Sequence, residues 1–241
     1  AAMLKYLSTV DQVLGWGVLS RERFLAAWIV LFALAGFYLL GFLRLQGVKP
    51  DESVGLGRLF TGMAFLVFSL SLLPGIFGAG LGELEPYVPP PSATSLVATA
   101  GGGAAKAGWI KNDLEGAFAQ AKAENKPVLV SFTGYACTNC KWMKANMFTK
   151  PDVAQKMSGF VLVELYTDGS DAVSEANQKL EEERFQTVAI PYYAILSPDD
   201  QVLATFAGLT RNEDEFLGFL AKAGATRWSG TRAGSRCSAH A

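Results

Sequence analysis

Two cysteines in a Cys-Thr-Asn-Cys sequence, Cys137 and Cys140, are the residues whose type and spacing point most directly to chemistry. Residues 128–132 before them have the apolar pattern of a buried strand, and the residues from Cys137 onward have the pattern of a helix. A helix N-terminus lowers the pKa of a cysteine, and the thiolate is the nucleophile of disulfide exchange. We therefore expect Cys137 to attack a substrate disulfide from an exposed position and Cys140 to resolve the mixed disulfide.

Other chemistries fit the composition less well. A Cys-x-x-Cys pair can form half of a zinc site, but the sequence has no second pair and its single histidine is His240. We therefore expect no metal site and no cofactor. Two buried cysteines can also serve packing alone, although the strand-then-helix context favours redox chemistry. The net charge of −1 gives no indication of a nucleic-acid partner.

Pro191 is a second marker, because it directly precedes the predicted strand at residues 192–196. A proline at the start of a strand fits a cis peptide bond, here with Ile190, or the start of an edge strand. An ordinary turn proline is the alternative. The position just before a predicted hairpin favours the cis bond.

The elements around these residues alternate between helix and strand from residue 109 to 225, which predicts an α/β domain. Asn112 and Glu115 indicate an N-cap for the first helix. The acidic run at residues 181–183 is expected to form a solvated helix face. The expected strands span residues 128–132, 160–166, 192–196 and 202–206, and the expected helices include residues 137–147 and 171–185.

Residues 1–82 form a predicted membrane region with helices at about 24–44 and 59–81. Each contains an uncharged apolar run long enough to cross a bilayer, which takes about 20 residues in a helix. The spacing of Gly78 and Gly82 predicts packing against another helix. Residues 83–108 are rich in Pro, Gly and Ser and are expected to form a linker, and residues 226–241 a disordered tail containing Cys237.

The motifs together resemble a known family. The strand VLVSF, the helix start CTNCK, the segment IPYYAIL and the later Gly208 resemble thioredoxin. The longer string FTGYACTNCKWMKANMF, preceded by ENKP and followed by PYYAIL, is similar to the C-terminal domain of the DsbD-type thiol:disulfide interchange proteins. The two apolar runs resemble the last two transmembrane helices of some members of that family.

This resemblance implies a thioredoxin fold, a central mixed sheet flanked by helices, preceded by two transmembrane helices. It implies a protein-disulfide reductase that passes electrons to extracytoplasmic protein disulfides, including those of cytochrome c maturation. It also implies that the protein is located in the inner membrane, where the two helices contact lipid, and that the thioredoxin-like domain faces the periplasm. Cys137 then matches the attacking cysteine and Cys140 the resolving one. Pro191 matches the cis-proline, which with Ile190 positions the substrate.

The sequence departs from the family pattern in two respects. Neither apolar run contains a cysteine, so the electrons are expected to come from a membrane thiol protein or from a further N-terminal part. The family's acidic residue six positions before the first cysteine is replaced by Ser131. Glu164 is the candidate to replace it as a proton relay, and a glutamate that points to water is the alternative. An oxidase or isomerase, or a non-enzymatic thioredoxin-fold subunit of a membrane complex, remain alternative functions.

Overall fold

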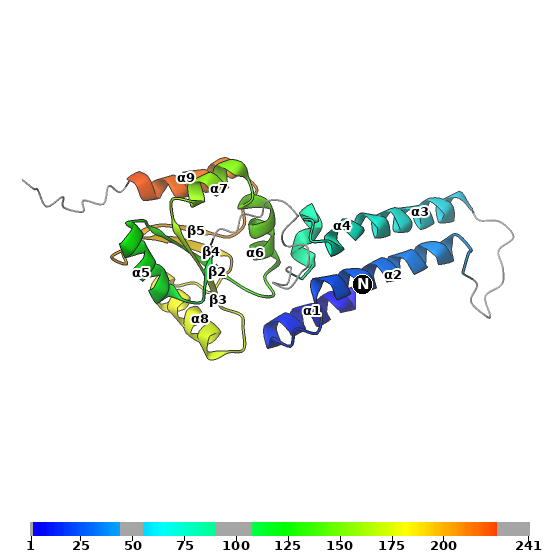
Figure 1. Ribbon diagram of the computed structural model, residues 1–241, viewed down its shortest axis with the longest axis horizontal. Helices are drawn as coiled ribbons and strands as arrows, with labels where there is room; N and C mark the ends of the chain where they lie inside the picture. Colours follow the sequence, from blue (N-terminus) through cyan, green and yellow to red (C-terminus); the bar gives the residue numbers. More distant parts are fainter. Residues whose placement is uncertain (1, 44–54, 90–107, 226–241) are drawn as a thin grey trace, which may run out of the picture.

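The computed structural model describes residues 2–43, 55–89 and 108–225. An N-terminal helical part and a C-terminal α/β part lie beside each other along the long axis of the molecule (Figure 1). Most of the predicted linker, residues 90–107, and the predicted tail with Cys237 lie outside the described residues.

A five-stranded mixed sheet forms the centre of the α/β part, in the order β1-β3-β2-β4-β5. The strands β1 (Ile110–Lys111), β3 (Val161–Tyr166) and β2 (Val128–Thr133) are parallel. The strands β4 (Tyr192–Leu196) and β5 (Val202–Ala207) continue the sheet antiparallel to β2. The carboxyl ends of the parallel strands β2 and β3 therefore meet at one edge of the sheet.

Helices cover both faces of the sheet because alternate residues of β2 point in opposite directions. Val128, Val130 and Phe132 pack with α5 (Leu114–Glu124) and α8 (Ala172–Phe185). Leu129 packs on the other face with α6 (Thr138–Trp142), its π-helical continuation η2 (Met143–Met147), α7 (Pro151–Met157) and α9 (Glu213–Ala225). The α/β order predicted from the sequence is thus present, with β1 as an additional short strand.

Two local predictions in this part are wrong. The N-cap of α5 is Asp113, which accepts the Gly116 N–H at 2.8 Å, and not Asn112. Asn112 has a positive φ of 54°, and its side-chain oxygen accepts the Tyr166 N–H at 2.8 Å instead. Glu181 does not lie on a solvated face: it is fully buried on the inner side of α8, whereas the next two residues are exposed.

The helical part is a hairpin of α2 (Arg21–Leu39) against α3 (Leu56–Ser71) and the short α4 (Leu73–Ile76). α2, the first predicted membrane helix, begins earlier than expected because Ser20 caps its N-terminus. Gly41, which has a left-handed backbone conformation, follows its C-terminal end. Gly36 and Gly62 allow the close approach, since a Cβ on Gly36 would lie 3.0 Å from the Gly62 carbonyl oxygen.

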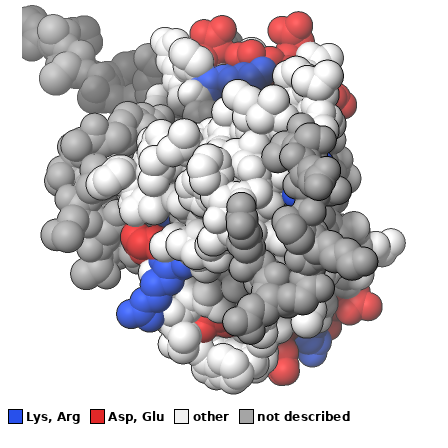
Figure 2. Space-filling model, turned by 90° about the vertical axis from the view of Figure 1, so that its right-hand side faces the viewer, with Lys and Arg blue, Asp and Glu red and all other residues white. Residues whose placement is uncertain are grey.

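The sequence predicted helix packing at Gly78 and Gly82, whereas the close approach occurs at Gly36 and Gly62. Gly78 and Gly82 both have positive φ and lie after the end of α4, Gly78 in a turn and Gly82 at the first residue of a 3₁₀-helix, so neither lies in a membrane helix. The described residues contain two helical segments long and apolar enough to cross a membrane, Arg21–Leu39 and Leu56–Ile76. Seen from the hairpin end, most of the described surface is uncharged (Figure 2).

Two further elements connect the hairpin to the α/β part. They are α1 (Ala2–Leu14) and the 3₁₀-helix η1 (Gly82–Tyr87), which occupies the start of the predicted linker. η1 is ordered because Glu85 binds the buried Arg21 at 2.6 Å. The Arg21 guanidinium also donates hydrogen bonds to the backbone carbonyl oxygens of Gly75, Ala79 and Pro89.

Candidate active site

A disulfide joins Cys137 and Cys140 at the start of α6, directly after the loop that follows β2. Cys137 is the N-cap residue of α6, and its sulfur accepts the Cys140 N–H at 3.1 Å. Cys140 is buried, with 2 % of its surface exposed, whereas Cys137 is half-buried. Cys137 therefore lies nearer the surface at the helix end, and Cys140 lies inside.

Asp168 holds the loop that leads to Cys137. Its carboxylate oxygens accept the N–H groups of Tyr135 at 2.7 Å and Ala136 at 2.8 Å. Gly134 permits this approach, because a Cβ there would lie 2.4 Å from an Asp168 oxygen and 2.7 Å from Cδ1 of Ile190. Asp168 was not among the site residues predicted from the sequence. The sequence feature that could have indicated this residue is its position just after β3, at the edge of the sheet where the parallel strand β2 also ends.

The peptide bond between Ile190 and Pro191 is cis, as the sequence predicts. Pro191 is buried, and its carbonyl oxygen accepts the Gly208 N–H at 2.8 Å. Ile190 lies against Gly134 in the loop before the disulfide. The loops after β2, β3 and α8 therefore meet beside the disulfide. The role of Ile190 and Pro191 in positioning a substrate stays a prediction.

Glu164 lies on β3 directly opposite Ser131 of β2, on the sheet face that α6 and η2 cover. Its carboxylate pairs with Lys144 of η2 and accepts the Tyr166 hydroxyl at 3.3 Å. The Glu164 side chain is 15 % exposed, so it does not point freely into water. Burial and the Glu164 carboxylate raise the pKa of Tyr166 well above its ordinary value, so the phenol stays protonated and able to donate.

Aromatic rings and lysines form a wall next to the cysteine loop. The ring of Tyr135 stacks on that of Tyr166 with centroids 4.2 Å apart. The ammonium groups of Lys111 and Lys144 lie 4.5 Å and 5.1 Å from the Tyr166 ring centroid. Such cation–π contacts fix the orientation of the rings, and they place two positive charges on this side of the site.

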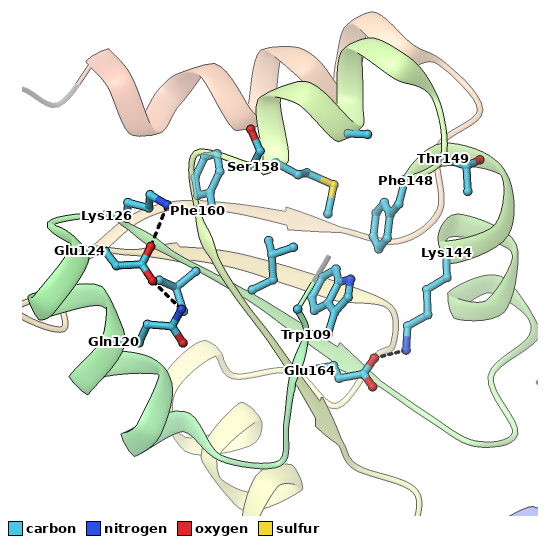
Figure 3. Close-up of a pocket in the computed structure, with 15 residues that line it drawn as sticks. Trp109, Gln120, Glu124, Lys126, Lys144, Phe148, Thr149, Ser158, Phe160 and Glu164 are labelled. Carbon is cyan, nitrogen blue, oxygen red and sulfur yellow. Dashed lines mark hydrogen bonds and ion pairs between the residues drawn. The ribbon is translucent and has the colours of Figure 1, made fainter. Parts of the chain in front are cut away.

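A cavity of about 490 Å³ lies between α5, α7, η2 and β3 (Figure 3). Trp109, Phe148 and Phe160 contribute its aromatic lining, and the Lys144–Glu164 pair lies at one end. Neither cysteine lines this cavity. It therefore connects Glu164 with solvent-accessible space but does not hold a substrate against the disulfide.

Lys141 follows the disulfide and is covered by α1. Its ammonium donates to the side-chain oxygen of Gln12 at 3.0 Å. Burial lowers the pKa of Lys141 to about 8; Asp168 opposes this shift, while Lys5 and Lys144 increase it. The side chain is thus still mostly protonated at pH 7 and adds positive charge beside the cysteine pair. Within residues 2–43, 55–89 and 108–225, no group of three metal-ligating side chains occurs.

The comparisons with known proteins concern this part of the chain. Residues 109–198 match a family model described as thioredoxin-like. The chain carries a thioredoxin fold. This match confirms the predicted fold class of the α/β part and supports membership of the thioredoxin superfamily. The fold, with the Cys137–Cys140 disulfide at the start of α6, is that of a thioredoxin-like disulfide oxidoreductase.

Several solved structures are similar to the chain in fold. A thioredoxin from Thermus thermophilus is 22 % identical, with 50 % of this chain and 91 % of that chain covered and a TM-score of 0.43. A protein titled DsbH oxidoreductase is 17 % identical, with 49 % and 85 % covered and a TM-score of 0.41. The oxidised C-terminal domain of Neisseria meningitidis DsbD is 23 % identical, with 46 % and 92 % covered and a TM-score of 0.38. The comparison with curated protein sequences found no match.

Proposed function

We propose that the chain is a membrane-tethered, DsbD-type protein-disulfide reductase that acts on extracytoplasmic proteins, including those of cytochrome c maturation. The observation that carries the proposal is the unequal burial of the two cysteines at the start of α6. Cys137 is half-buried at the helix end, and Cys140 is buried behind it. That arrangement suits one cysteine to attack a substrate and the other to act only inside the mixed disulfide.

The reaction transfers two electrons to the substrate. In the reduced pair, the Cys137 thiolate attacks one sulfur of the substrate disulfide and expels the other sulfur as a thiolate. A mixed disulfide forms. Cys140 then loses its proton and attacks the Cys137 sulfur, which releases the second substrate thiolate. The substrate takes up two protons, and the chain is left with the Cys137–Cys140 disulfide.

Glu164 is the proposed acceptor of the proton that Cys140 loses. Its position supports the proposal, because it lies on the sheet face beneath α6, opposite Ser131. Its partner Lys144 lies one helical turn beyond Cys140, and its carboxylate borders a cavity through which water can exchange protons. Glu164→Gln is expected to slow the resolving step and leave the attack by Cys137 unchanged. Rapid-quench measurement of the mixed disulfide separates the two steps.

A second thiol protein must reduce the pair again after each turnover. The described parts of α2 and α3 contain no cysteine, so we propose a separate membrane dithiol or a further N-terminal part as electron donor. The two apolar helices support a tether in lipid, and we place the thioredoxin-like domain on the periplasmic side of the inner membrane. Protein disulfides on that side are the proposed substrates.

The decisive measurement is the reduction potential of the Cys137–Cys140 pair in the full chain, by equilibration with dithiothreitol buffers. Known potentials run from about −270 mV for thioredoxin to about −120 mV for DsbA. A value near the first supports the reductase. A value near the second would make the chain an oxidant. Unchanged cellular function in a Cys137→Ser variant would instead favour a non-enzymatic subunit.

A further inference from the structure

Two glutamates of η1 bind different parts of the molecule. Glu85 pairs with the buried Arg21 and so fixes η1 to the membrane hairpin. Glu83 accepts a hydrogen bond from Nε1 of Trp142 at 3.1 Å and lies 3.7 Å from the guanidinium of Arg211. The Arg211 guanidinium in turn lies over the Trp142 ring at 5.2 Å. One carboxylate thus fixes η1 to the hairpin, and the other contacts the thioredoxin-like domain.

Both partners of Glu83 belong to elements that border the disulfide. Trp142 lies in the last turn of α6, which begins with the cysteine pair. Arg211 lies in the loop after β5, whose Gly208 is hydrogen-bonded to the cis-proline. α6 lies on the side of the domain that faces η1 and α1 (Figure 1). We refer to α1 and η1 together as the stalk.

α1 adds a second contact beside the disulfide. Gln12 accepts a hydrogen bond from Lys141, the residue after the buried cysteine. Lys5 of α1 lies 4.5 Å from the ring centroid of Tyr87 in η1, so the two elements of the stalk also contact each other. The stalk therefore covers the surface next to the cysteine pair from two directions.

The contact made by Glu83 is weak enough to open without unfolding. The side chains of Glu83 and Arg211 are 68 % and 71 % exposed, and an ion pair this exposed changes an equilibrium by a factor of about two to five at most. We propose that the stalk is a reversible docking surface for the active-site face of the thioredoxin-like domain. In the docked state, small reagents reach Cys137 and folded proteins do not. The physiological meaning of this gate rests on the function proposed above.

The test measures access to Cys137 by size. The full chain with Cys140→Ser and Cys237→Ser, purified in detergent, has Cys137 as its one remaining thiol. It is labelled with N-ethylmaleimide and with a polyethylene-glycol maleimide of the size of a small protein. The rates of both labelling reactions are measured in this double-serine background and in the same background with Glu83→Ala added. Glu175→Ala, an exposed glutamate on α8, is the matched control.

We expect Glu83→Ala to accelerate the bulky reagent about two- to fivefold and to leave the rate of N-ethylmaleimide unchanged. High salt should accelerate the bulky reagent in the unaltered background and add little in Glu83→Ala. Trp142→Phe, which removes the indole N–H, should act in the same direction, and the double variant should exceed neither single variant by much.

Equal labelling of Glu83→Ala and Glu175→Ala by the bulky reagent would overturn the docking surface. So would an equal acceleration of both reagents, because that result indicates a more reactive thiol and not a more open site. Labelling needs no electron transfer. A chain that labels as expected but never reduces a disulfide would therefore refute the proposed function and leave the docking surface standing.

Discussion

Replacement of Glu181 by Gln should remove a pH dependence of stability that is built into the thioredoxin-like domain. Glu181 is fully buried on α8, and neither of its carboxylate oxygens has a hydrogen-bond partner among the described residues. Burial without a partner penalises the charged form, and it raises the pKa of Glu181 from 4.5 to about 7. The folded protein therefore holds a proton that the unfolded chain has already lost between these pH values.

The sign and size follow from this shift. Because the folded state binds more protons in that window, the free energy of unfolding falls as pH rises from 4.5 to about 7. One pKa unit corresponds to about 1.4 kcal/mol, so the full loss is about 3 kcal/mol. For a domain slightly larger than 100 residues, 1 kcal/mol shifts Tm by roughly 4 °C, so the loss corresponds to a Tm decrease of about 10 °C.

Thermal unfolding of the full chain in detergent, followed by near-ultraviolet circular dichroism at pH 5 and pH 8, tests this prediction. The single histidine, His240, lies outside the predicted domain. Glu181→Gln should show a Tm that changes much less between the two pH values than that of the unaltered chain. Glu182→Gln, an exposed neighbour, should keep the original difference. The reasoning is refuted if Glu181→Gln retains the full pH dependence, since the carboxylate would then be solvated in the folded state.

Three further outcomes are expected. Cys140→Ser should accumulate mixed disulfides with substrate proteins, seen as reducible adducts in non-reducing gels, because the attacking cysteine remains but resolution fails; the absence of adducts would contradict its resolving role. Asp168→Ala removes two hydrogen bonds to a carboxylate, each worth about 1.5–3 kcal/mol, and should lower Tm and slow disulfide exchange about tenfold, a factor that corresponds to 1.4 kcal/mol. Asp152→Ala on α7 is its control and should change neither quantity. Arg21→Ala leaves a carboxylate of η1 unpaired and should destabilise the membrane hairpin by about 3–5 kcal/mol, measured as a loss of hydrogen-exchange protection in η1. Arg23→Ala, which removes an exposed arginine two residues away, should preserve that protection.

The features that the sequence predicted correctly are those set by local pattern. The apolar β2 and the cysteines at the following helix start are contiguous in the chain, so strand period and helix capping place the pair without knowledge of the rest. Pro191 could likewise be interpreted from its position before a strand. The two apolar runs were identified by length and composition, although their ends were not, because Ser20 and Gly41 set those ends through backbone conformation.

The features that could not be predicted from the sequence depend on packing between distant segments. The run at residues 181–183 reads as one charged face, yet the helix turns by about 100° per residue and puts Glu181 alone against the sheet. Asn112 has the side chain of an N-cap, but β3 and α8 bring the Tyr166 N–H and Asn177 to it, so Asp113 caps the helix. No local pattern contains this information.

By itself, then, the sequence located the cysteine pair on which the proposed chemistry rests, because two cysteines at a strand-to-helix junction are a short, local arrangement. Only the tertiary structure decided what surrounds the pair. Asp168 reaches the cysteine loop because β2 and β3 are parallel and end at the same edge of the sheet. Glu83 reaches Trp142 because Arg21 orders η1 across the join between the hairpin and the domain. Contacts of this kind depend on which surfaces are buried together, and burial is a property of the assembled fold.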